Sequence, residues 1–350
     1  MVSISMDRIT LMHGAGGSLM HNLIQNHILR MLKPYMEFEV PLTALDDAGV
    51  CNGIVFTTDS YTVKPLFFNG GDIGRLAVSG TVNDIACIGG KPLALSLALV
   101  MEEGLSLNDL ERILASIEHT CKEAGVDILT GDTKVVERGS LDKLIINTSG
   151  IGVRNPLLDS NLRYVNRSIR WLLDSNLRAG DKIIVSGSIA DHGMAVLSAR
   201  EGYGFTSKIC SDVMPLNRLI DRALEAGGVV CIKDPTRGGV ANLLNEWAEK
   251  SDVGIMVYED KIPIKESVRA AASFLGIDPL EVGNEGKVCI AVTPDRAEHV
   301  LEAIRECDEG RDAEIIGEAT DQFRAVAMRT MIGGTRIIVK PSGDPVPRIC

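Results

Sequence analysis

The stretch Val229-Val-Cys-Ile-Lys-Asp-Pro-Thr-Arg-Gly-Gly239 carries the pattern from which we infer the class of fold. Its apolar start, residues 229–232, is typical of a buried strand, and Asp, Pro and Gly then mark a turn. Residues 239–250 follow with the composition of a helix. A strand, a short acidic loop and a helix in succession indicate an α/β protein.

Composition supports this class and argues against several functions. The chain has 350 residues, 45% of them apolar and 35 of them glycine, so we expect two α/β domains with many tight turns. A net charge of −11 argues against nucleic acid or an acidic membrane as the main partner. The longest apolar run, residues 92–101, is too short to span a bilayer, and we expect no signal peptide. The eight cysteines show no CxxC pair, which favours a reducing, cytoplasmic location.

The patterns along the chain divide it into five segments. We expect an N-terminal arm and helix (1–40), a first α/β domain (41–155), a linker (156–180), a second α/β domain (181–340) and a tail (341–350). In the first domain, the predicted strands are 53–58, 93–101 and 144–153, and the predicted helices are 72–88 and 107–124. In the second, the strands are 182–186, 229–232, 254–258, 288–292, 314–316, 325–328 and 336–339, and the helices are 194–200, 216–226, 239–250, 265–274 and 294–307.

The linker contains an exact internal repeat. Leu157-Leu-Asp-Ser-Asn-Leu-Arg163 returns as residues 172–178. Two short copies are too few for a repeat fold, so we interpret them as a local duplication that lengthened the connection between the domains. Apolar spacing between residues 158 and 172 predicts a helix over this segment.

A set of aspartates stands where apolar runs end. They are Asp46, Asp47, Asp59, Asp84 and Asp234, and Asp132 in Leu129-Thr-Gly-Asp-Thr-Lys134 belongs to the same pattern. Such carboxylates repel one another at a common point unless Mg²⁺ lies between them, which predicts a metal–phosphate site. A single aspartate at a strand end is more often a cap or a turn former, so this prediction depends on the fold bringing them together.

The N-terminal stretch His13-Gly-Ala-Gly-Gly-Ser18 could bind phosphate. Gly14, Gly16 and Gly17 would expose backbone N–H groups where a helix begins. A flexible arm explains the same glycines equally well. The spacing is not that of a dinucleotide fingerprint.

Two further stretches carry polar side chains beside apolar strands. In Gly131-Asp-Thr-Lys134, which we place where a strand passes into a loop, Asp132 and Thr133 could contact phosphate and Lys134 could supply a mobile charge. In Gly283-Asn-Glu-Gly-Lys287, Glu285 stands between glycines just before a strand, where a catalytic acid and a simple turn are equally plausible. We interpret His192, in Ala190-Asp-His-Gly193, as a structural histidine.

The last ten residues, Pro341-Ser-Gly-Asp-Pro-Val-Pro-Arg-Ile-Cys350, form an extended and mobile tail. Fully extended, they would span roughly 33 Å, enough to carry the Cys350 thiol into a cleft. Arg348 could help to dock the tail. Without the other motifs, a frayed end with a chance cysteine would be the simpler interpretation.

Together these motifs resemble the superfamily of aminoimidazole ribotide synthetase, selenide water dikinase and thiamine-monophosphate kinase. The residues that carry this resemblance are Asp46-Asp47-Ala48, Thr57-Thr-Asp59, Val82-Asn-Asp84, Gly131-Asp-Thr133 and Lys233-Asp-Pro-Thr-Arg-Gly-Gly239. Within it, the chain resembles the HypE family of hydrogenase maturation factors, through His13–Gly17, Asp132-Thr-Lys-Val-Val136, Ala190–Gly193, Asn284-Glu-Gly286 and, most specifically, Pro347-Arg-Ile-Cys350. The likeness runs from about Ile9 to Cys350 and departs at the duplication.

This resemblance implies a fold, an assembly and a site. Two α/β domains are expected, the first pairing with that of a second chain into a dimeric β-barrel, with a flexible C-terminal tail. ATP and Mg²⁺ would bind near the dimer-forming domain. The implied catalytic residues are Cys350, Lys134 and Glu285, with Lys134 acting as a base or electrostatically. The implied nucleotide-binding residues are Gly14, Gly16, Gly17, Asn83, Asp132 and Thr133, and the other aspartates above would hold the metal.

The resemblance also implies a reaction. Cys350 would accept a carbamoyl group from the carbamoyltransferase HypF, and ATP would be used to dehydrate it to a thiocyanate. The cyano group would pass to iron on a HypC–HypD complex for nickel–iron hydrogenase. Two alternatives stay open: a small-molecule phosphotransferase of the same superfamily, which would not need the tail, and a non-catalytic metallocentre scaffold with Cys350 as a ligand.

Overall fold

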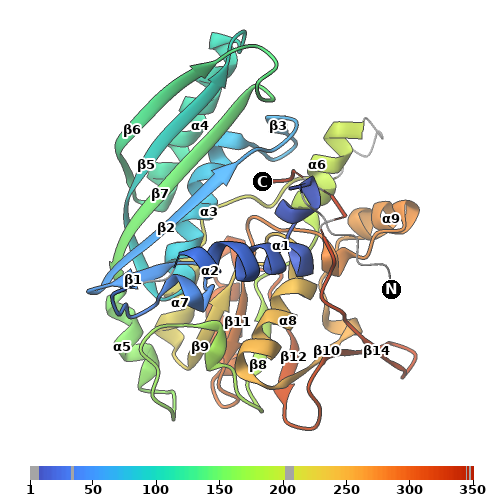
Figure 1. Cartoon of the computed structure of the whole chain (residues 1–350). Coiled ribbons are helices and arrows are strands. Elements are labelled where there is room, and N and C mark those ends of the chain that lie inside the picture. Colours follow the sequence, from blue (N-terminus) through green and yellow to red (C-terminus); the bar gives the residue numbers. More distant parts are fainter. Residues whose placement is uncertain (1–7, 33–34, 202–208, 344, 347) are drawn as a thin grey trace.

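The computed structural model describes residues 8–32, 35–201, 209–343, 345–346 and 348–350. The expected N-terminal arm is therefore described only from residue 8, and the predictions for positions 344 and 347 of the tail lie outside the described residues. Two sheets organise the chain, one from each half (Figure 1).

The first half builds a five-stranded sheet in the order β1-β2-β7-β5-β6. Its strands are β1 Gly49–Cys51, β2 Ile54–Tyr61, β7 Leu144–Arg154, β5 Gly90–Glu102 and β6 Asp127–Val136. Neighbours are antiparallel except β5 and β6, which are parallel. Helices α3 Ile73–Cys87 and α4 Leu107–Ala124 cover one face, and the small two-stranded sheet of β3 Phe67–Phe68 and β4 Gly71–Asp72 precedes α3 (Figure 1).

The helix ends in this half follow ordinary capping rules. The Asp72 carboxylate accepts hydrogen bonds from the N–H groups of Gly74 and Arg75, and so caps α3. The Ser106 hydroxyl accepts from the Asp109 N–H at the start of α4. Gly125, with φ of 74°, ends α4 in the left-handed conformation that glycine adopts most easily.

The second half builds a seven-stranded mixed sheet in the order β14-β13-β10-β12-β8-β11-β9. The strands are β8 Lys182–Val185, β9 Val229–Lys233, β10 Gly254–Tyr258, β11 Cys289–Val292, β12 Glu314–Thr320, β13 Val326–Arg329 and β14 Thr335–Ile337. The helices are α6 Asp191–Glu201, α7 Asn217–Ala226, α8 Gly239–Ser251, α9 Glu266–Leu275 and α10 Ala297–Arg305.

Side chains from the central strands of this sheet enter two different cores. Ile184 and Ile290 pack into the core that contains residues of α7 and α10, whereas Ile183 and Val185 pack into the core that contains residues of α8. Strands buried on both faces are continuously apolar, which is why the sequence predicted them well.

Two structural predictions need correction, while the predicted dimeric barrel stays a prediction. The predicted helix over residues 158–172 is wrong, because α5 Pro156–Leu162 ends within the first repeat copy. Gly131-Asp-Thr-Lys134 does not stand at a strand-to-loop transition but lies within β6, an edge strand that the sequence did not predict. The first sheet is open, with β1 and β6 as its edges, so the described chain forms no closed barrel by itself.

The two ends of the chain meet between the halves. Helix α1 Gly17–Leu23, the π-helical turn Ile24–Ile28 and α2 Leu29–Met31 cross the front of the molecule (Figure 1). The Ser18 N–H donates a hydrogen bond to the Pro341 carbonyl, 3.0 Å away. Among the residues that the structure describes, no helix combines the length and apolar character needed to cross a membrane.

Candidate active site

A pocket lies where the two halves meet, beneath α1. Its walls come from the loop before β1, from β2 and α3, from the segment that follows β9, from α8 and from the end of the tail. All five predicted metal ligands line it, and so do Gly16, Gly17, Glu285 and Cys350. The fold thus gathers residues from positions 16 to 350 at one place.

The aspartates in this pocket carry uncompensated negative charge. Burial raises the pKa of Asp47 and Asp84 well above the usual range, and neighbouring carboxylates raise both further. Burial and then the charge of Asp59 raise the pKa of Asp234 to about 7. Burial also raises the pKa of Asp59 and Asp46. A divalent cation among these carboxylates would relieve their repulsion.

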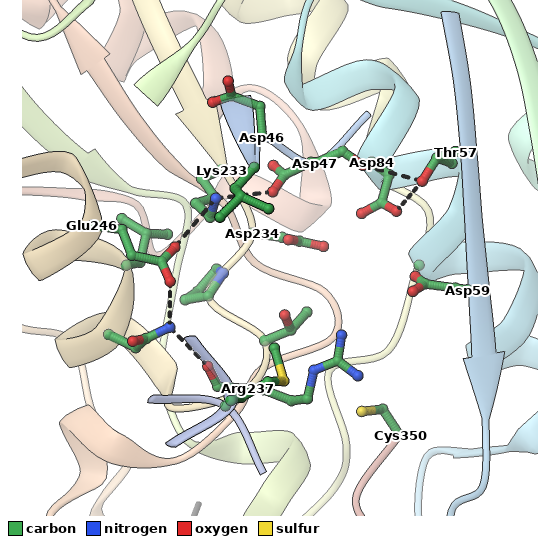
Figure 2. A pocket seen from close by; sticks show the side chains of 18 of the residues that line it. Asp46, Asp47, Thr57, Asp59, Asp84, Lys233, Asp234, Arg237, Glu246 and Cys350 are labelled. Atoms are coloured by element: carbon green, nitrogen blue, oxygen red, sulfur yellow. Dashed lines mark hydrogen bonds and ion pairs between the residues drawn. The ribbon is translucent and has the colours of Figure 1, made fainter. Parts of the chain in front are cut away.

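Short polar contacts fix the orientation of the acids from β2 and α3. The Thr57 hydroxyl donates to Asp84 Oδ2 at 2.8 Å and lies 3.1 Å from the Asp47 carbonyl oxygen, so it links β2, α3 and the loop before β1 (Figure 2). The Tyr61 hydroxyl donates to Asp59 Oδ2 at 3.1 Å. Gly80 makes this possible, because an added Cβ there would lie 2.3 Å from the Tyr61 oxygen.

Two basic residues balance part of this charge. Lys233 Nζ lies 3.2 Å from Asp47 Oδ1 and 3.4 Å from Glu246 Oε2. Arg237 approaches the pocket from the other side (Figure 2), and the charge of Cys350, followed by those of Asp59 and Glu285, raises the pKa of its guanidinium despite burial. The pocket therefore has a strongly acidic wall and one cationic corner next to the tail.

The donor set suits Mg²⁺ bound together with phosphate. Among the residues that the structure describes, no three His, Cys, Asp or Glu side chains already form a metal-binding group. Protein-bound Mg²⁺ usually takes one or two carboxylates and completes its shell with phosphate oxygens and water. Asp234, which is buried, and Asp47 and Asp84, which are half-buried, are the carboxylates that fit such a role.

Glu285 is a buried carboxyl group that faces the pocket. Its side chain is buried, and no hydrogen-bond partner of its Oε1 is found among the described residues. Burial, followed by Asp234 and Asp212, raises its pKa well above the ordinary value, and Arg237 opposes this shift. Because its pKa is shifted upward, this carboxyl group holds a proton more readily than an exposed glutamate, which suits it to proton exchange with a bound group.

The end of the tail is held against residues 62–64. The Thr62 N–H donates to the Cys350 carbonyl oxygen at 3.1 Å, and the Lys64 N–H donates to the Arg348 carbonyl at 3.3 Å. The Arg348 guanidinium donates to the Thr62 carbonyl oxygen and contacts Asp142 at 3.1 Å. These contacts place Cys350 in the pocket in this structure (Figure 2).

The residue before the cysteine anchors the tail in both polar and apolar ways. The Ile349 carbonyl oxygen lies 2.8 Å from His192 Nε2, while His192 Nδ1 lies 2.8 Å from the Ser211 hydroxyl. Burial lowers the pKa of His192. The Ile349 side chain packs against Gly283, where an added Cβ would lie 2.4 Å from it. The tail therefore rests directly on the loop that carries Glu285.

Five predicted site residues do not line the pocket. Lys134, Asp132 and Thr133 lie on the exposed edge strand β6, where Lys134 Nζ is 3.4 Å from Asp132 Oδ2. Asn83 is buried, accepts a hydrogen bond from the Leu216 N–H and donates to the Met214 carbonyl. Gly14 has no heavy atom within 4 Å of an added Cβ.

Several pocket residues received no role from the sequence. Lys233 and Arg237 flank Asp234 in the stretch quoted first, and their charge beside an acidic cluster was a usable signal. Thr57 and Tyr61 precede and follow Asp59 at intervals of two along β2, which places all three on one face of the strand. Asp174, which contacts Lys233, gave no such signal because it lies in the linker.

Comparison with known proteins identifies the family of the chain. The family model for the N-terminal domain of AIR synthase related proteins matches residues 45–154 of this chain. The model for their C-terminal domain matches residues 178–329. The carbamoyl dehydratase HypE of Azotobacter vinelandii is 44% identical over 98% of this chain and 97% of its own length.

Two solved structures are similar throughout. One, from the crystal structure of a HypE–HypF complex, has 46% identity and a TM-score of 0.83 over 91% of this chain and 99% of that one. The other, a hydrogenase maturation protein HypE in complex with ATP, has 41% identity and a TM-score of 0.79 over 98% of this chain and 100% of that one. The chain therefore belongs to the HypE family of hydrogenase maturation proteins, whose named relatives are carbamoyl dehydratases.

Proposed function

We propose that this protein is an ATP-dependent carbamoyl dehydratase that acts on its own C-terminal cysteine. The observation that carries the proposal is the position of Cys350 in the same pocket as Glu285, Arg237 and the acidic wall. A phosphotransferase with an external substrate would not need its own C-terminus in the pocket. A metal scaffold would need ligands beside Cys350, and the acidic wall is better suited to Mg²⁺ and phosphate than to a thiolate-bound metal.

The proposed reaction converts a thiocarbamate into a thiocyanate. The carbamoyl oxygen on Cys350 attacks the γ-phosphorus of ATP, the bond to ADP breaks, and the oxygen becomes a phosphate leaving group. Two N–H protons and the phosphate are then lost, so that S–C(O)NH₂ and ATP give S–C≡N, ADP and phosphate. Mg²⁺ would neutralise phosphate charge during this step, with Asp47, Asp84 and Asp234 as its candidate ligands.

The residues near Cys350 are suited to the two steps of this reaction, phosphoryl transfer and proton removal. Arg237 offers a fixed cation where negative charge develops on the carbamoyl oxygen and the transferred phosphoryl group. Glu285 is buried and faces the pocket, so it is our candidate for accepting an N–H proton. Gly16 and Gly17 also line the pocket, and an added Cβ at Gly16 would lie 2.9 Å from the Cβ of Arg237, so this glycine backbone lies next to the same cation.

Lys134 would reach this chemistry only from a second copy of the chain. Its strand, β6, is three strand spacings from β2, which is roughly 14 Å and farther than a lysine side chain extends. Support for a dimer comes from the open face of the first sheet, where Ile54 and Phe56 are 53% and 51% exposed. In the proposed homodimer, these faces pair into a barrel and bring β6 of the partner, with Asp132, Thr133 and Lys134, towards the pocket.

The proposed partners follow from the reaction. HypF would deliver the carbamoyl group, in line with the HypE–HypF complex known for a similar chain. A HypC–HypD complex would receive the cyano group on iron. Because the thiol must remain reduced, we place the protein in the cytoplasm.

Intact-mass spectrometry tests the proposal. The purified protein is incubated with HypF, carbamoyl phosphate and ATP, and wild type is compared with Cys350→Ala. The wild type should gain a carbamoyl group and then lose one water only when ATP can be hydrolysed. Cys350→Ala should gain nothing. An adduct that persists in this variant, or loss of water without ATP, would contradict the proposed function.

A further inference from the structure

The duplicated heptapeptide gives the same seven residues two different structures. The first copy, residues 157–163, lies largely in α5, whereas the second, residues 172–178, enters a 3₁₀ turn at Asp174–Asn176. Since the sequences are identical, the surroundings and not local propensity determine each conformation. The chain thus contains the same side chains in two places.

The asparagines of the two copies have the same role, because both form hydrogen bonds with the backbone of β9. The Asn161 amide donates to the Val229 carbonyl and accepts from the Val229 N–H, both at 2.8 Å. The Asn176 amide donates to the Val230 carbonyl at 2.9 Å. Strand β9 stands at the edge of its sheet, so the two asparagines bind backbone groups that no neighbouring strand pairs.

The aspartates of the two copies differ completely. Asp159 lies on the surface, with 76% of its side chain exposed, and pairs with Arg154. Asp174 is 2% exposed. Its Oδ2 accepts from Lys233 Nζ at 2.8 Å and Lys250 Nζ at 2.7 Å, and its Oδ1 accepts from the Trp247 indole N–H at 2.8 Å.

Asp174 also reaches the acids of the pocket. Its backbone N–H donates to Asp46 Oδ1 at 3.0 Å, and its carboxylate shares Lys233 with Asp47. Lys250, its second partner, donates to the Leu45 carbonyl at 2.6 Å. The loop that carries Asp46 and Asp47 is therefore tied to Asp174 directly and through two lysines.

We propose that Asp174 is a positioning residue of the metal–nucleotide site, which neutralises Lys233 and Lys250 and fixes Asp46 and Asp47. This rests on the proposed function of the pocket. Without the Asp174 charge, the half-buried ammonium groups of Lys233 and Lys250 would keep only their longer contacts to Asp47, Glu246 and Asp46, and would repel Mg²⁺ more strongly. Buried partners of metal ligands typically change metal affinity by about 10- to 100-fold. The duplication supplies the control, since Asp159 has the same neighbours in sequence and none of these contacts.

Calorimetric titration with β,γ-methylene-ATP, in Mg²⁺ and in EDTA, tests this. The quantity compared is the gain in nucleotide affinity that Mg²⁺ produces. Asp174→Asn should reduce this gain by about tenfold or more, while binding in EDTA is unchanged or tighter because a negative charge is gone. Asp159→Asn should leave both affinities within about twofold of wild type.

Further variants cover the case in which Asp174→Asn does not fold. Asp174→Asn/Lys250→Met removes one of the two ammonium groups that have lost the Asp174 charge, and should recover part of the folded protein and part of the Mg²⁺-dependent gain. Asp174→Glu keeps the negative charge, so the gain in nucleotide affinity from Mg²⁺ should fall less than it does in Asp174→Asn. An unchanged gain in folded Asp174→Asn, or an equal loss in Asp159→Asn, would overturn the role of Asp174. Absence of nucleotide binding by the wild type would instead overturn the proposed function.

Discussion

The two sheets of the molecule differ in how they are covered. The central strands of the second sheet are buried on both faces, and Ile184 and Ile290 are fully inaccessible. The first sheet has helices on one face only, while Ile54, Phe56 and Val153 remain exposed on the other. The covered half contributes its residues to the pocket without a second chain, since Asp234 and Glu285 already line it. The open half leaves β6 and Lys134 outside the pocket, and in our proposal a second chain completes it.

The largest effect should come from the covered half. In Glu285→Gln, the proposed base can no longer accept a proton, so the loss of water should slow by about 10²- to 10⁴-fold. Carbamoyl transfer to Cys350 should continue, because the tail and its thiol are unchanged. Intact masses followed over time in a single turnover measure both steps. A normal dehydration rate would remove Glu285 from the mechanism.

Lys134, from the open half, should also be needed for dehydration, but its side chain should act in the pocket of the other chain. Lys134→Ala alone should lose about 10²-fold in dehydration rate, in the range expected for a catalytic proton or charge partner. Mixed with Glu285→Gln under conditions that exchange subunits, it should recover roughly a quarter of the wild-type rate, because half of the random dimers carry one intact site. If subunits exchange and no activity returns, Lys134 does not act across a dimer.

The exposed apolar face of the first sheet should be the interface itself. Phe56→Glu would place a charge in it and should weaken self-association by about 100-fold or more, as burial of an unpaired charge costs several kcal/mol. The matched control is Ile332→Glu, since Ile332 is 95% exposed on the second half. Sedimentation velocity over a range of concentrations measures both. An equal effect of the two changes, or of neither, would refute this interface.

The same contrast explains which parts of the fold were predictable. The second sheet was predicted strand by strand because each buried strand is a short apolar run bounded by turns. β6 was missed because most of its residues are exposed, so nothing imposes an apolar alternation on its sequence. The predicted helix over residues 158–172 failed for a different reason. Its apolar residues are real core residues, but tertiary contacts of Asn161 and Asp174 set the local backbone.

The part of the candidate site that could be predicted from the sequence is its set of aspartates, because they recur at the ends of apolar runs. Five of the six aspartates at the ends of apolar runs converge in the pocket, as their pattern suggested, whereas Asp132 lies on β6 outside it. Lys233 and Arg237, which balance part of their charge, were not predicted although both stand close to Asp234 in the sequence, and Asp174 becomes a neighbour of Asp46 and Lys233 only through the folding of the linker. His192 is structural, as the sequence suggested, and yet it holds the tail through Ile349.

A smaller effect should come from this contact of His192, which holds the tail on the covered half. His192→Phe keeps the packing volume next to Phe68 but removes the hydrogen bond to the Ile349 carbonyl. Dehydration should slow by about five- to tenfold, the value of one buried hydrogen bond, because Cys350 spends less time in the pocket. Carbamoyl transfer by HypF should not slow, and His192→Gln, which can still donate, should restore part of the rate. Equal slowing of both steps would show a general loss of structure.

The smallest effect concerns the stability of the chain without ligands, at the junction of the two halves. The pKa of Asp234 is raised from 3.8 to about 7, so burial favours the protonated carboxyl in the folded state. The stability that this group contributes is fully present below pH 4 and is lost as the pH rises through 7. Asp234→Asn stays neutral at every pH and should therefore raise the unfolding temperature at pH 8 by roughly 2 °C or more, with a smaller difference at pH 5. Differential scanning calorimetry at the two pH values measures this, and a variant that is less stable than wild type at pH 8 would show that the Asp234 carboxylate is stabilised by Lys233 and Arg237 rather than strained by the other acids.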